Sequence, residues 1–334
     1  MARVASFNIQ RSQNLNHLAN LIFDSKFDFV LLQEFALPSS YNGQHRLEIF
    51  QPSRSSSSAI AWLRGTVDYD LSSVDGGPFR EKWSIVSQNN LQFPTSTPMA
   101  LTTFTSDMVI HHNDSGQYFW LISTYSPCES TPLHRGFHKC LHEAIRATYC
   151  DLRDRYNGIS TILGGDFNYD PARTIANSRP HHVRYRTWAE FEDLAQELGL
   201  NDAFLQTAPA GTQGHTNGKT GHGSRLDRLY TSPSVTDKLL TFSIHAKFAG
   251  THHGISIAII LDPESKLALG PGRYTLRPEN LLNSFIDDWF SFMPPSTYAA
   301  ATSLMRTVEI KTRQVRKSAR KRVPSLITPP ANRP

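Results

Sequence analysis

The sequence predicts an α/β protein in which two sheets pack face to face and helices lie on their outer sides. Three observations predict this fold class. Short apolar runs of strand length recur through the first 262 residues, a few segments with helical spacing lie between them, and turn-rich segments separate them. The turn-rich segments are 53–58, 113–116 and 211–223, and the sequence contains no internal repeat.

Strands are expected wherever a short apolar run is bounded by polar or turn residues. The first two runs, 3–7 and 27–32, lie on either side of a helical pattern, and the run 160–163 is expected to be buried. The expected strands are 3–7, 27–32, 58–63, 101–110, 118–124, 160–163, 225–230, 239–246 and 255–261.

Helices are expected where apolar residues recur every three or four positions. Leu15, Leu18 and Ile22 follow this spacing in the first helical pattern, between the first two strands. The expected helices are 15–23, 134–156 and 188–198, and a shorter helical pattern covers 281–290.

The formal net charge of +5 is unevenly distributed along the chain. Residues 311–322, KTRQVRKSARKR, hold seven Lys or Arg and no acid, and Arg333 adds one more. Without these eight, 26 basic residues remain against 29 acidic ones, so the part up to residue 310 has a charge near −3. Attraction of nucleic acid by net charge therefore belongs to the tail, and the acid excess elsewhere is what a metal site contributes.

These patterns divide the chain into three expected parts. Residues 1–262 are expected to form the catalytic domain, and 263–310 a linker that contains the short helical segment. Residues 311–334 are expected to form a basic, disordered tail.

Composition argues against membrane insertion and secretion. The sequence has no stretch near the roughly 18 consecutive apolar residues that a membrane helix needs, and MARVASFNIQ lacks the layout of a secretory signal. Three cysteines, Cys128, Cys140 and Cys150, form no CxxC pair, which indicates reduced thiols rather than disulfides or a zinc site. We therefore expect an intracellular protein, for which the nucleus is one option.

Six short polar clusters lie beside or at the ends of the expected strands. Taken singly, each has an ordinary structural interpretation, such as a turn for Asp-Phe-Asn. Taken together they predict a site, because strand ends at one edge of a sheet share a single crevice. The clusters contain Asn8 (SFNIQ), Glu34 (VLLQE), Tyr125 (ISTYSP), Asp166 and Asn168 (ILGGDFN), Asp227 (SRLDRLY), and His252 and His253 (THHGIS).

These residue types fit metal-assisted phosphodiester hydrolysis. Magnesium is held by one or two carboxylates, so Glu34 would anchor the ion and Asn8 could add a neutral oxygen. The reaction also needs a group that aligns or deprotonates water and groups that stabilise negative charge. Asp166, Asn168 and His253 are of the right types for these tasks.

The two adjacent histidines have different expected roles. A histidine in such a site generally needs a carboxylate on its other ring nitrogen, and Asp227 is the natural partner for His253. His252 is expected to be available as a metal ligand.

The ordered set FNIQ, LLQE, TYSP, GGDFN, SRLD and THHG resembles the endonuclease/exonuclease/phosphatase superfamily, whose members carry N, QE, Y-x-P, GDxN, LD and SDH in that order. The matches span residues 7–254, and the ordered set is far more specific than any single motif. The resemblance implies a four-layered α/β sandwich of two packed, mainly antiparallel sheets with helices on the outside.

The resemblance also implies roles for the clustered residues. Glu34 would ligate the metal with Asn8 near it, and Asp166 would align or deprotonate the attacking water. The implied ion is Mg²⁺, with Mn²⁺ as the alternative, and a second ion near Asp166 is left open. No other small-molecule cofactor is expected.

The remaining implied roles concern the phosphate. Asn168 and Tyr125 would lie against it, and His253 would be oriented by Asp227.

The subfamily follows from Tyr125 and from segments outside the motifs. Phosphatases, sphingomyelinases and secreted deoxyribonucleases usually carry a histidine where this chain has Tyr125. Tyr-x-Pro is instead similar to apurinic/apyrimidinic endonucleases and to the endonuclease domains of LINE-type retrotransposons. LAQELGLNDAF and GPGRYTLRPENLL resemble the second group, where the latter leads into a reverse transcriptase.

The chain departs from the superfamily pattern at Gln10, which replaces an acidic residue of some repair enzymes, and at two further places. The motif Ser-Asp-His is matched by Thr251, His252 and His253, so that His252 would replace an aspartate and weaken metal binding or turnover. Asn217 follows Thr216 where relatives commonly place an aromatic residue, which argues against a stacked pocket for an abasic sugar.

Three hypotheses remain open. The first is a retrotransposon-type endonuclease that nicks one DNA strand and leaves a 3′-hydroxyl. The second is a phosphoesterase for abasic DNA, RNA ends or small phosphoesters. The third is a non-catalytic nucleic-acid-binding fold, suggested by the missing aspartate and the basic tail.

DNA is the expected partner, and the oligomeric state is left open. The residues expected to contact DNA are Arg225, Lys311, Arg313, Arg316, Lys317, Arg320, Lys321 and Arg322.

Overall fold

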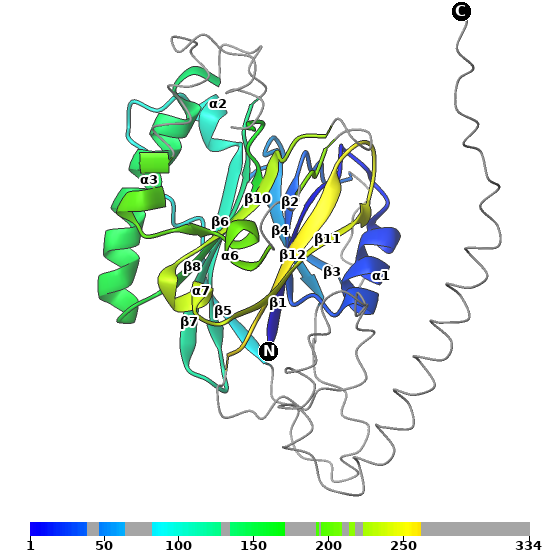
Figure 1. The fold of residues 1–334 in the computed structure, drawn as a ribbon. Coiled ribbons are helices and arrows are strands. Elements are labelled where there is room, and N and C mark those ends of the chain that lie inside the picture. The colour runs from blue at the N-terminus through cyan, green and yellow to red at the C-terminus, as the bar shows by residue number, and fades with distance from the viewer. Residues whose placement is uncertain are drawn as a thin grey trace, which may run out of the picture. The chain divides into compact units, whose positions relative to one another are not determined.

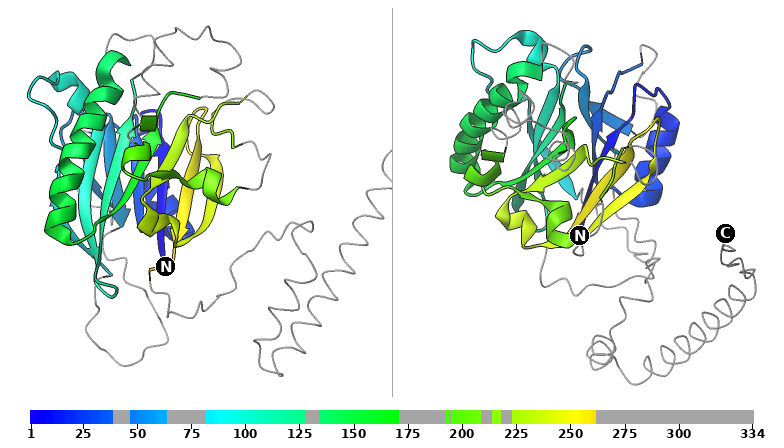
Figure 2. Two further views of the ribbon diagram at one scale, coloured as in Figure 1. Left: turned by 60° about the vertical axis from the view of Figure 1, so that its left-hand side comes forward. Right: turned by 45° about the horizontal axis from the view of Figure 1, so that its top comes forward.

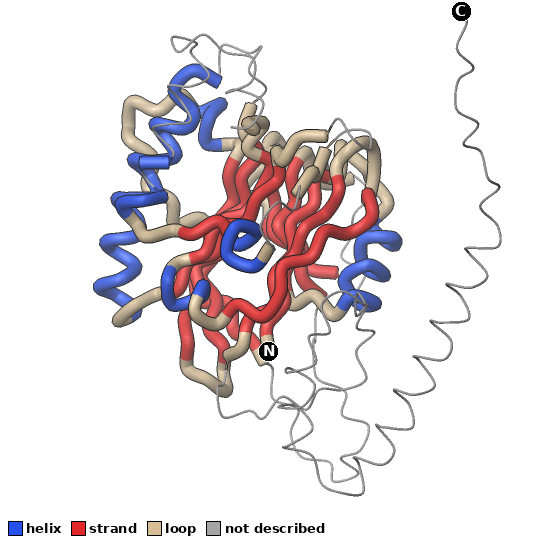
Figure 3. Tube along the Cα trace, viewed as in Figure 1, coloured by secondary structure: helices blue, strands red, loops and turns tan. Residues whose placement is uncertain are grey.

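The computed structural model describes residues 1–38, 47–63, 82–127, 134–170, 192–193, 195–208, 214–217 and 223–261. They form two six-stranded sheets that pack against each other, with α3 (His134–Tyr156) and α1 (Leu15–Ser25) on opposite outer sides (Figure 1). Figure 2 shows the same layers from two further directions, and Figure 3 separates strands from helices. The expected sandwich of two packed sheets is confirmed.

The first sheet has the order β11-β12-β1-β2-β4-β3. Its one parallel pair is β1 with β2, and the other neighbours are antiparallel. The strands are β1 (Ala2–Asn8), β2 (Phe29–Gln33), β3 (Leu47–Phe50), β4 (Ser58–Leu63), β11 (Leu239–Lys247) and β12 (His253–Ile259).

The second sheet has the order β5-β6-β7-β8-β10-β9, with one parallel pair, β7 with β8. The strands are β5 (Trp83–Gln88), β6 (Thr105–His112), β7 (Gln117–Tyr125), β8 (Ser160–Asp166), β9 (Asn201–Asp202) and β10 (Asp227–Thr231). The short helices are α2 (Met99–Thr102), α6 (Ala203–Thr207) and α7 (Pro233–Thr236).

Three apolar layers account for the four-layered arrangement. The middle layer lies between the sheets and includes Val4, Leu31 and Leu121. The outer layers lie under the long helices, as with Ala5 under α1 and Trp120 under α3. Neighbouring residues of one strand thus enter different layers, because successive side chains of a strand point to opposite faces.

The helix and strand boundaries agree with the sequence in some places and differ in others. Helix 134–156 and strand 58–63 have the expected boundaries, whereas β3 and β5 were not expected. The start of the expected strand 101–110 is wrong, because Pro98 precedes the short helix α2 and the strand begins at Thr105. Pro cannot donate a backbone hydrogen bond, and it favours helix starts over strand interiors.

Several expected segments lie wholly or partly outside the described residues. Of the expected helix 188–198, residues 192–193 and 195–198 are described; 192–193 and 195–197 are helical, and 198 begins a turn. The linker 263–310 with its segment 281–290, and the tail 311–334, lie outside the described residues. In the described part, no helix combines the length and apolarity needed to cross a membrane.

The layer between the sheets becomes polar toward one end. In β1 the side chains on this face change from Val4 to Ser6 and Asn8, and in β2 the same face ends in Gln33. Gln33 Nε2 donates to Ser123 Oγ of the other sheet over 3.2 Å, so polar groups join the sheets there. This end of the layer is where the motif residues gather.

Candidate active site

Five strand termini from the two sheets meet at the polar end, namely the ends of β1, β2, β7 and β8 and the start of β10. Because β1 and β2 are parallel, and β7 and β8 are parallel, each pair ends at the same edge. Antiparallel β10 begins at that edge, which places Asp227 opposite Asp166, and Tyr125 lies opposite Asp166 on the other side. The register therefore brings three motif residues to one level of the second sheet.

Gly164 allows the two sheets to come close below Asp166. A Cβ added at Gly164 would lie 2.7 Å from Leu31 of the first sheet and 2.5 Å from Leu229 of β10. Both distances are shorter than van der Waals contact, so a larger residue would have to displace these two leucine side chains. The glycine of the GGDFN motif thus helps to bring Asp166 to the residues of the first sheet.

Asn8 connects the carboxylates of the two sheets. Its Nδ2 donates to Glu34 Oε1 over 2.8 Å and to Asp166 Oδ2 over 2.9 Å. Its Oδ1 accepts a hydrogen bond from the backbone N–H of Gln10 at 3.0 Å, which fixes the amide orientation. One buried amide therefore holds Glu34 and Asp166 around a common point.

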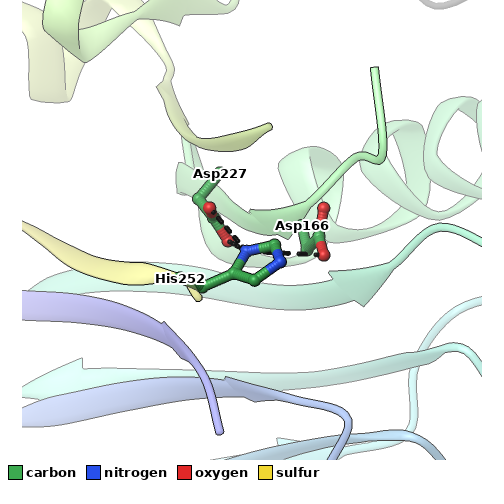
Figure 4. Close-up of side chains that lie close together, drawn as sticks. All are labelled: Asp166, Asp227 and His252. Carbon is green, nitrogen blue, oxygen red and sulfur yellow. Dashed lines mark hydrogen bonds and ion pairs between the residues drawn. The ribbon is translucent and has the colours of Figure 1, made fainter. Parts of the chain in front are cut away.

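Asp166, Asp227 and His252 form a buried cluster whose side chains point toward one another (Figure 4). Nδ1 of His252 lies 2.9 and 3.2 Å from the two carboxylate oxygens of Asp227, and 3.8 Å from Asp166 Oδ2. All three residues are at most 5% exposed. Two carboxylates and one imidazole therefore share a space that excludes most water.

Burial and neighbouring charge shift the pKa values of this cluster. Burial, followed by the charge of Asp227, raises the pKa of Asp166 to about 7. Burial lowers the pKa of His252, but the hydrogen bond and charge of Asp227, with smaller contributions from Asp166 and Glu34, outweigh it and raise that pKa to about 9. The carboxylates thus favour an imidazolium between them.

Asn168 and the Tyr125 loop pack against Asp166. The backbone N–H of Asn168 donates to Asp166 Oδ1 over 2.9 Å, and Asn168 Nδ2 donates to the carbonyl oxygen of Ser126 over 2.6 Å. Ser126 Oγ also lies 3.0 Å from Nε2 of His138 on α3. Ser126 and His138 were not expected, although Ser126 stands inside the Tyr-x-Pro motif.

Strained backbone conformations concentrate in these loops. Of the seven described non-glycine residues with positive φ, four flank the site: Gln10 (46°), Arg11 (60°), Glu34 (49°) and Asn168 (49°). Such conformations cost about 1–3 kcal/mol each and persist only where surrounding contacts enforce them. Here they turn the chain sharply at the ends of β1, β2 and β8.

The expected pairing of Asp227 with His253 is wrong. His253 Nδ1 donates to the carbonyl oxygen of His245 over 2.9 Å, and its half-buried side chain is the first of β12. Because side chains alternate along an extended chain, only one of the two histidines can face Asp227, and it is His252. The residue before the paired histidine is then Thr251, so Thr251 stands where the superfamily motif has aspartate.

Both ring nitrogens of His252 have partners. Nε2 lies 2.7 Å from Asn217 Nδ2, and Nδ1 faces Asp227. The role of His252 as a metal ligand therefore stays a prediction. Asn217 was singled out in the sequence as an unusual residue, but its contact with the histidine was not expected.

Arg225 makes its described contacts away from the Asp166, Asp227 and His252 cluster. Its guanidinium forms an ion pair with Asp202 and lies 5.0 Å from the ring centroid of Phe204. Asp202 also pairs with the buried Arg228 at 3.2 Å, so Arg225 belongs to a structural ionic cluster. These contacts argue against the expected role of Arg225 in DNA binding. The other residues expected to bind DNA, which range from Lys311 to Arg322, lie outside the described part of the chain.

The acidic groups of the site fit a divalent cation. Hard cations prefer carboxylate oxygens, and Glu34 and Asp166 converge on one amide while Asp227 lies beside Asp166. A fully buried Asp166 whose pKa is raised toward neutrality is a carboxylate that a nearby cation would stabilise. Asp166, Asp227 and His252 offer ligand atoms within 4.8 Å of one another, but the hydrogen bond between Asp227 and His252 leaves Glu34 and Asp166 as the better ligands.

The chain matches a protein family and the fold of several solved structures. The model of a family described as the Endonuclease/Exonuclease/phosphatase family matches residues 5–240. No curated protein matches the chain significantly.

Solved structures show the same fold at low sequence identity. One is the endonuclease domain of TRAS1, a telomere-specific non-LTR retrotransposon, with 18% identity, a TM-score of 0.50, and coverage of 78% of this chain and 98% of that chain. An AP endonuclease from Archaeoglobus fulgidus has 15% identity and a TM-score of 0.54, over 78% and 99% of the two chains. The 3′ phosphatase NExo from Neisseria, bound to a product DNA hairpin, has 16% identity and a TM-score of 0.53, over 78% and 100%.

Proposed function

Because the chain belongs to the endonuclease/exonuclease/phosphatase family of phosphoesterases, we propose that it is a divalent-metal-dependent phosphodiesterase that nicks one strand of DNA. The observation that carries this proposal is the position of Asn8, whose amide holds Glu34 and Asp166 together beside the pair of Asp227 and His252. Residues from both sheets thus form one acidic site with one cationic side chain.

Asp166 is the proposed base of the reaction. Burial and the charge of Asp227 raise the pKa of Asp166 to about 7, and a base works best when its pKa lies near the working pH. It would accept a proton from the water that attacks phosphorus, while the bond between phosphorus and the 3′ oxygen breaks. The products are a 5′-phosphate and a 3′ oxyanion, which takes a proton from solvent to become the 3′-hydroxyl. Asn8 and the backbone N–H of Asn168 orient the carboxylate for this transfer.

His252 and Asn168 are proposed to stabilise negative charge on the phosphoryl oxygens. Asp227 holds the imidazole of His252 and favours its protonated form, which offsets phosphate charge. Asn168 is fixed by Ser126, and Tyr125 ends the neighbouring strand at the same level. The charge-stabilising role expected for His253 is thereby proposed for His252 instead.

Glu34 and Asp166 would hold Mg²⁺ or Mn²⁺, with Asn8 beside them. When bound, the ion would polarise the phosphoryl oxygen and offset the charge that develops on it. The carboxylates must be deprotonated to bind it, so binding would weaken in acid.

DNA is proposed as the substrate on sequence grounds. Tyr125 in Tyr-Ser-Pro and the segment 194–204 are similar to LINE-type endonuclease domains, and phosphatase branches usually carry a histidine in place of this tyrosine. The absence of an aromatic residue at Asn217 argues against an abasic-site pocket.

The test is nicking of supercoiled plasmid by the full chain with Mg²⁺, and with EDTA as a control. Glu34→Ala, Asp166→Asn and His252→Ala should each abolish most of the nicking, whereas His253→Ala should retain it. Nicking that persists in Glu34→Ala, Asp166→Asn and His252→Ala would contradict the proposed active site.

A substrate panel separates the proposal from its alternatives. Faster cleavage of abasic DNA, RNA or a small phosphoester than of intact duplex would indicate that this substrate, and not intact DNA, is the one on which the protein acts. Duplex binding that is strongly salt-dependent, is lost on deletion of 311–322 and occurs without any cleavage would indicate a non-catalytic DNA-binding protein.

A further inference from the structure

The side chain of Asn217 covers the ring nitrogen of His252 that Asp227 leaves open. Asn217 Nδ2 lies 2.7 Å from His252 Nε2, a distance as short as a strong hydrogen bond. An amide can turn by 180°, so Asn217 can donate to a bare ring nitrogen or accept from a protonated one. The hydrogen bond between Asn217 and His252 can therefore form whether Nε2 is protonated or not.

The backbone keeps Asn217 in this position. Its N–H donates to the carbonyl oxygen of Ser224 over 2.9 Å, and its carbonyl oxygen accepts from the N–H of Ser224 over 2.8 Å. The preceding carbonyl, of Thr216, accepts from the N–H of His253 over 2.7 Å. With the main chain held on both sides, the amide of Asn217 can leave the ring only by rotation of its own side chain.

Asp227 is sufficient to place the ring. Both of its carboxylate oxygens face Nδ1, and Thr216 Oγ1 accepts from the backbone N–H of Asp227 over 3.0 Å. The imidazole therefore keeps its position when the contact at Nε2 is exchanged for another acceptor. Nε2 is the nitrogen that remains for a phosphoryl oxygen.

We propose that Asn217 competes with substrate, because its side chain occupies Nε2 of His252 until a substrate phosphoryl oxygen displaces it. This inference rests on the proposed function of the same site. Substrate binding then includes the loss of one hydrogen bond inside the protein, which weakens apparent affinity by about two- to tenfold. The chemical step is unaffected, because the amide has left the ring before it occurs.

The kinetic test compares Asn217→Ala with Asn217→Asp on a defined duplex oligonucleotide with Mg²⁺. Asn217→Ala should lower KM by about two- to tenfold with kcat unchanged, because no side chain then competes for Nε2. Asn217→Asp has nearly the same shape but should raise KM, since a carboxylate binds the imidazolium more tightly and repels phosphate. Asn20→Ala, on the exposed face of α1, is the matched control and should change neither constant.

A loss of kcat in Asn217→Ala with unchanged KM would overturn the proposal, because Asn217 would then only support the structure. KM values that rise in both variants would overturn it as well.

A binding measurement is independent of metal and of turnover. Inorganic phosphate is titrated into the full-length protein in EDTA while the ¹H–¹⁵N signals of the His252 imidazole, assigned with His252→Ala, are followed by NMR. The phosphate Kd should fall by about two- to tenfold in Asn217→Ala and stay unchanged in Asn20→Ala. Equal Kd values in wild type and Asn217→Ala would overturn the inference.

The two measurements also separate this inference from the proposed function. If no phosphodiester is cleaved but Asn217→Ala still tightens phosphate binding at His252, the proposed function fails, whereas the competition of Asn217 with phosphate for Nε2 stands.

Discussion

Asp107 and Asp166 lie in the same sheet, both are completely buried, and burial is the largest cause of a raised pKa in each. Their surroundings differ. Asp107 accepts hydrogen bonds from Trp120 Nε1 at 2.9 Å, from the backbone and side-chain N–H groups of Asn90 at 3.0 Å, and from the backbone N–H of Leu91 at 3.1 Å. Asp107 therefore fastens the segment after β5 to the sheet.

Asp166 has fewer donors and a carboxylate beside it. It accepts from Asn8 Nδ2 and from the backbone N–H of Asn168, both at 2.9 Å, and the charge of Asp227 raises its pKa further. Buried carboxylates are stabilised by hydrogen bonds or by cations. The comparison shows that a carboxylate satisfied by neutral donors supports the fold, whereas one crowded by a second carboxylate marks a site for a cation and for proton transfer.

The largest expected effect is that of Asp166→Asn on cleavage. The change removes the proposed base and one metal ligand, so nicking should fall by about 10²–10⁴-fold. The free energy of unfolding at pH 8 should stay the same or rise, because a charge repelled by Asp227 is removed. Plasmid-nicking rates and denaturant unfolding measure the two quantities. If Asp166→Asn were destabilised but still active, Asp166 would have a structural role like that of Asp107 and no catalytic one.

The next effect distinguishes the two adjacent histidines. His252→Ala removes the imidazole that pairs with Asp227 and should lower kcat/KM by about 10²–10³-fold. His253→Ala removes a hydrogen bond to a backbone carbonyl and should lower it by less than about fivefold. The measurement is kcat/KM on one duplex substrate for both variants. A larger loss of kcat/KM in His253→Ala than in His252→Ala would instead support the pairing of Asp227 with His253.

A smaller effect is expected for Asp107→Asn, this time on stability. An amide cannot accept all the hydrogen bonds that Asp107 receives, so the free energy of unfolding should fall by about 1–3 kcal/mol. Nicking at a temperature where the variant is folded should match the wild type. Chemical denaturation and the nicking assay provide the test, and loss of cleavage in a fully folded variant would contradict the structural role of Asp107.

The smallest expected effect is a pH dependence that belongs to Asp166. Its pKa in the folded protein is raised from 3.8 to about 7, so the folded state holds a proton that the unfolded state has lost. The stabilisation is present below the unfolded pKa and is lost as pH rises toward 7. In EDTA, the difference in unfolding free energy between Asp166→Asn and wild type should therefore increase from pH 5 to pH 8 by about 1 kcal/mol or more. A difference that does not change with pH would contradict the raised pKa.

Periodicity determined much of the fold. The short apolar run in 58–63 and the long helical pattern in 134–156 gave correct boundaries, because the strand is buried on both faces within the sandwich and the helix packs one face against a sheet. The strands β3 and β5 were not predicted from the sequence, because their burial is only partial and their apolar patterns are weak. Tertiary pairing at the sheet edges, rather than local sequence, makes them strands.

The sequence by itself determined which residues end the central strands, because each motif follows directly after, or begins, a short apolar run. It therefore predicted that Asn8, Glu34, Asp166 and Asp227 would lie near one another, as the structure has them. It could not determine which of two adjacent histidines faces Asp227, because a shift of one residue in an extended chain reverses the face of every side chain. The packing of Phe7 on Gly254 and the pairing of β12 with β1 help to fix that register. Only the tertiary structure placed Asn217 on His252, since that contact joins a loop to a strand end 35 residues away.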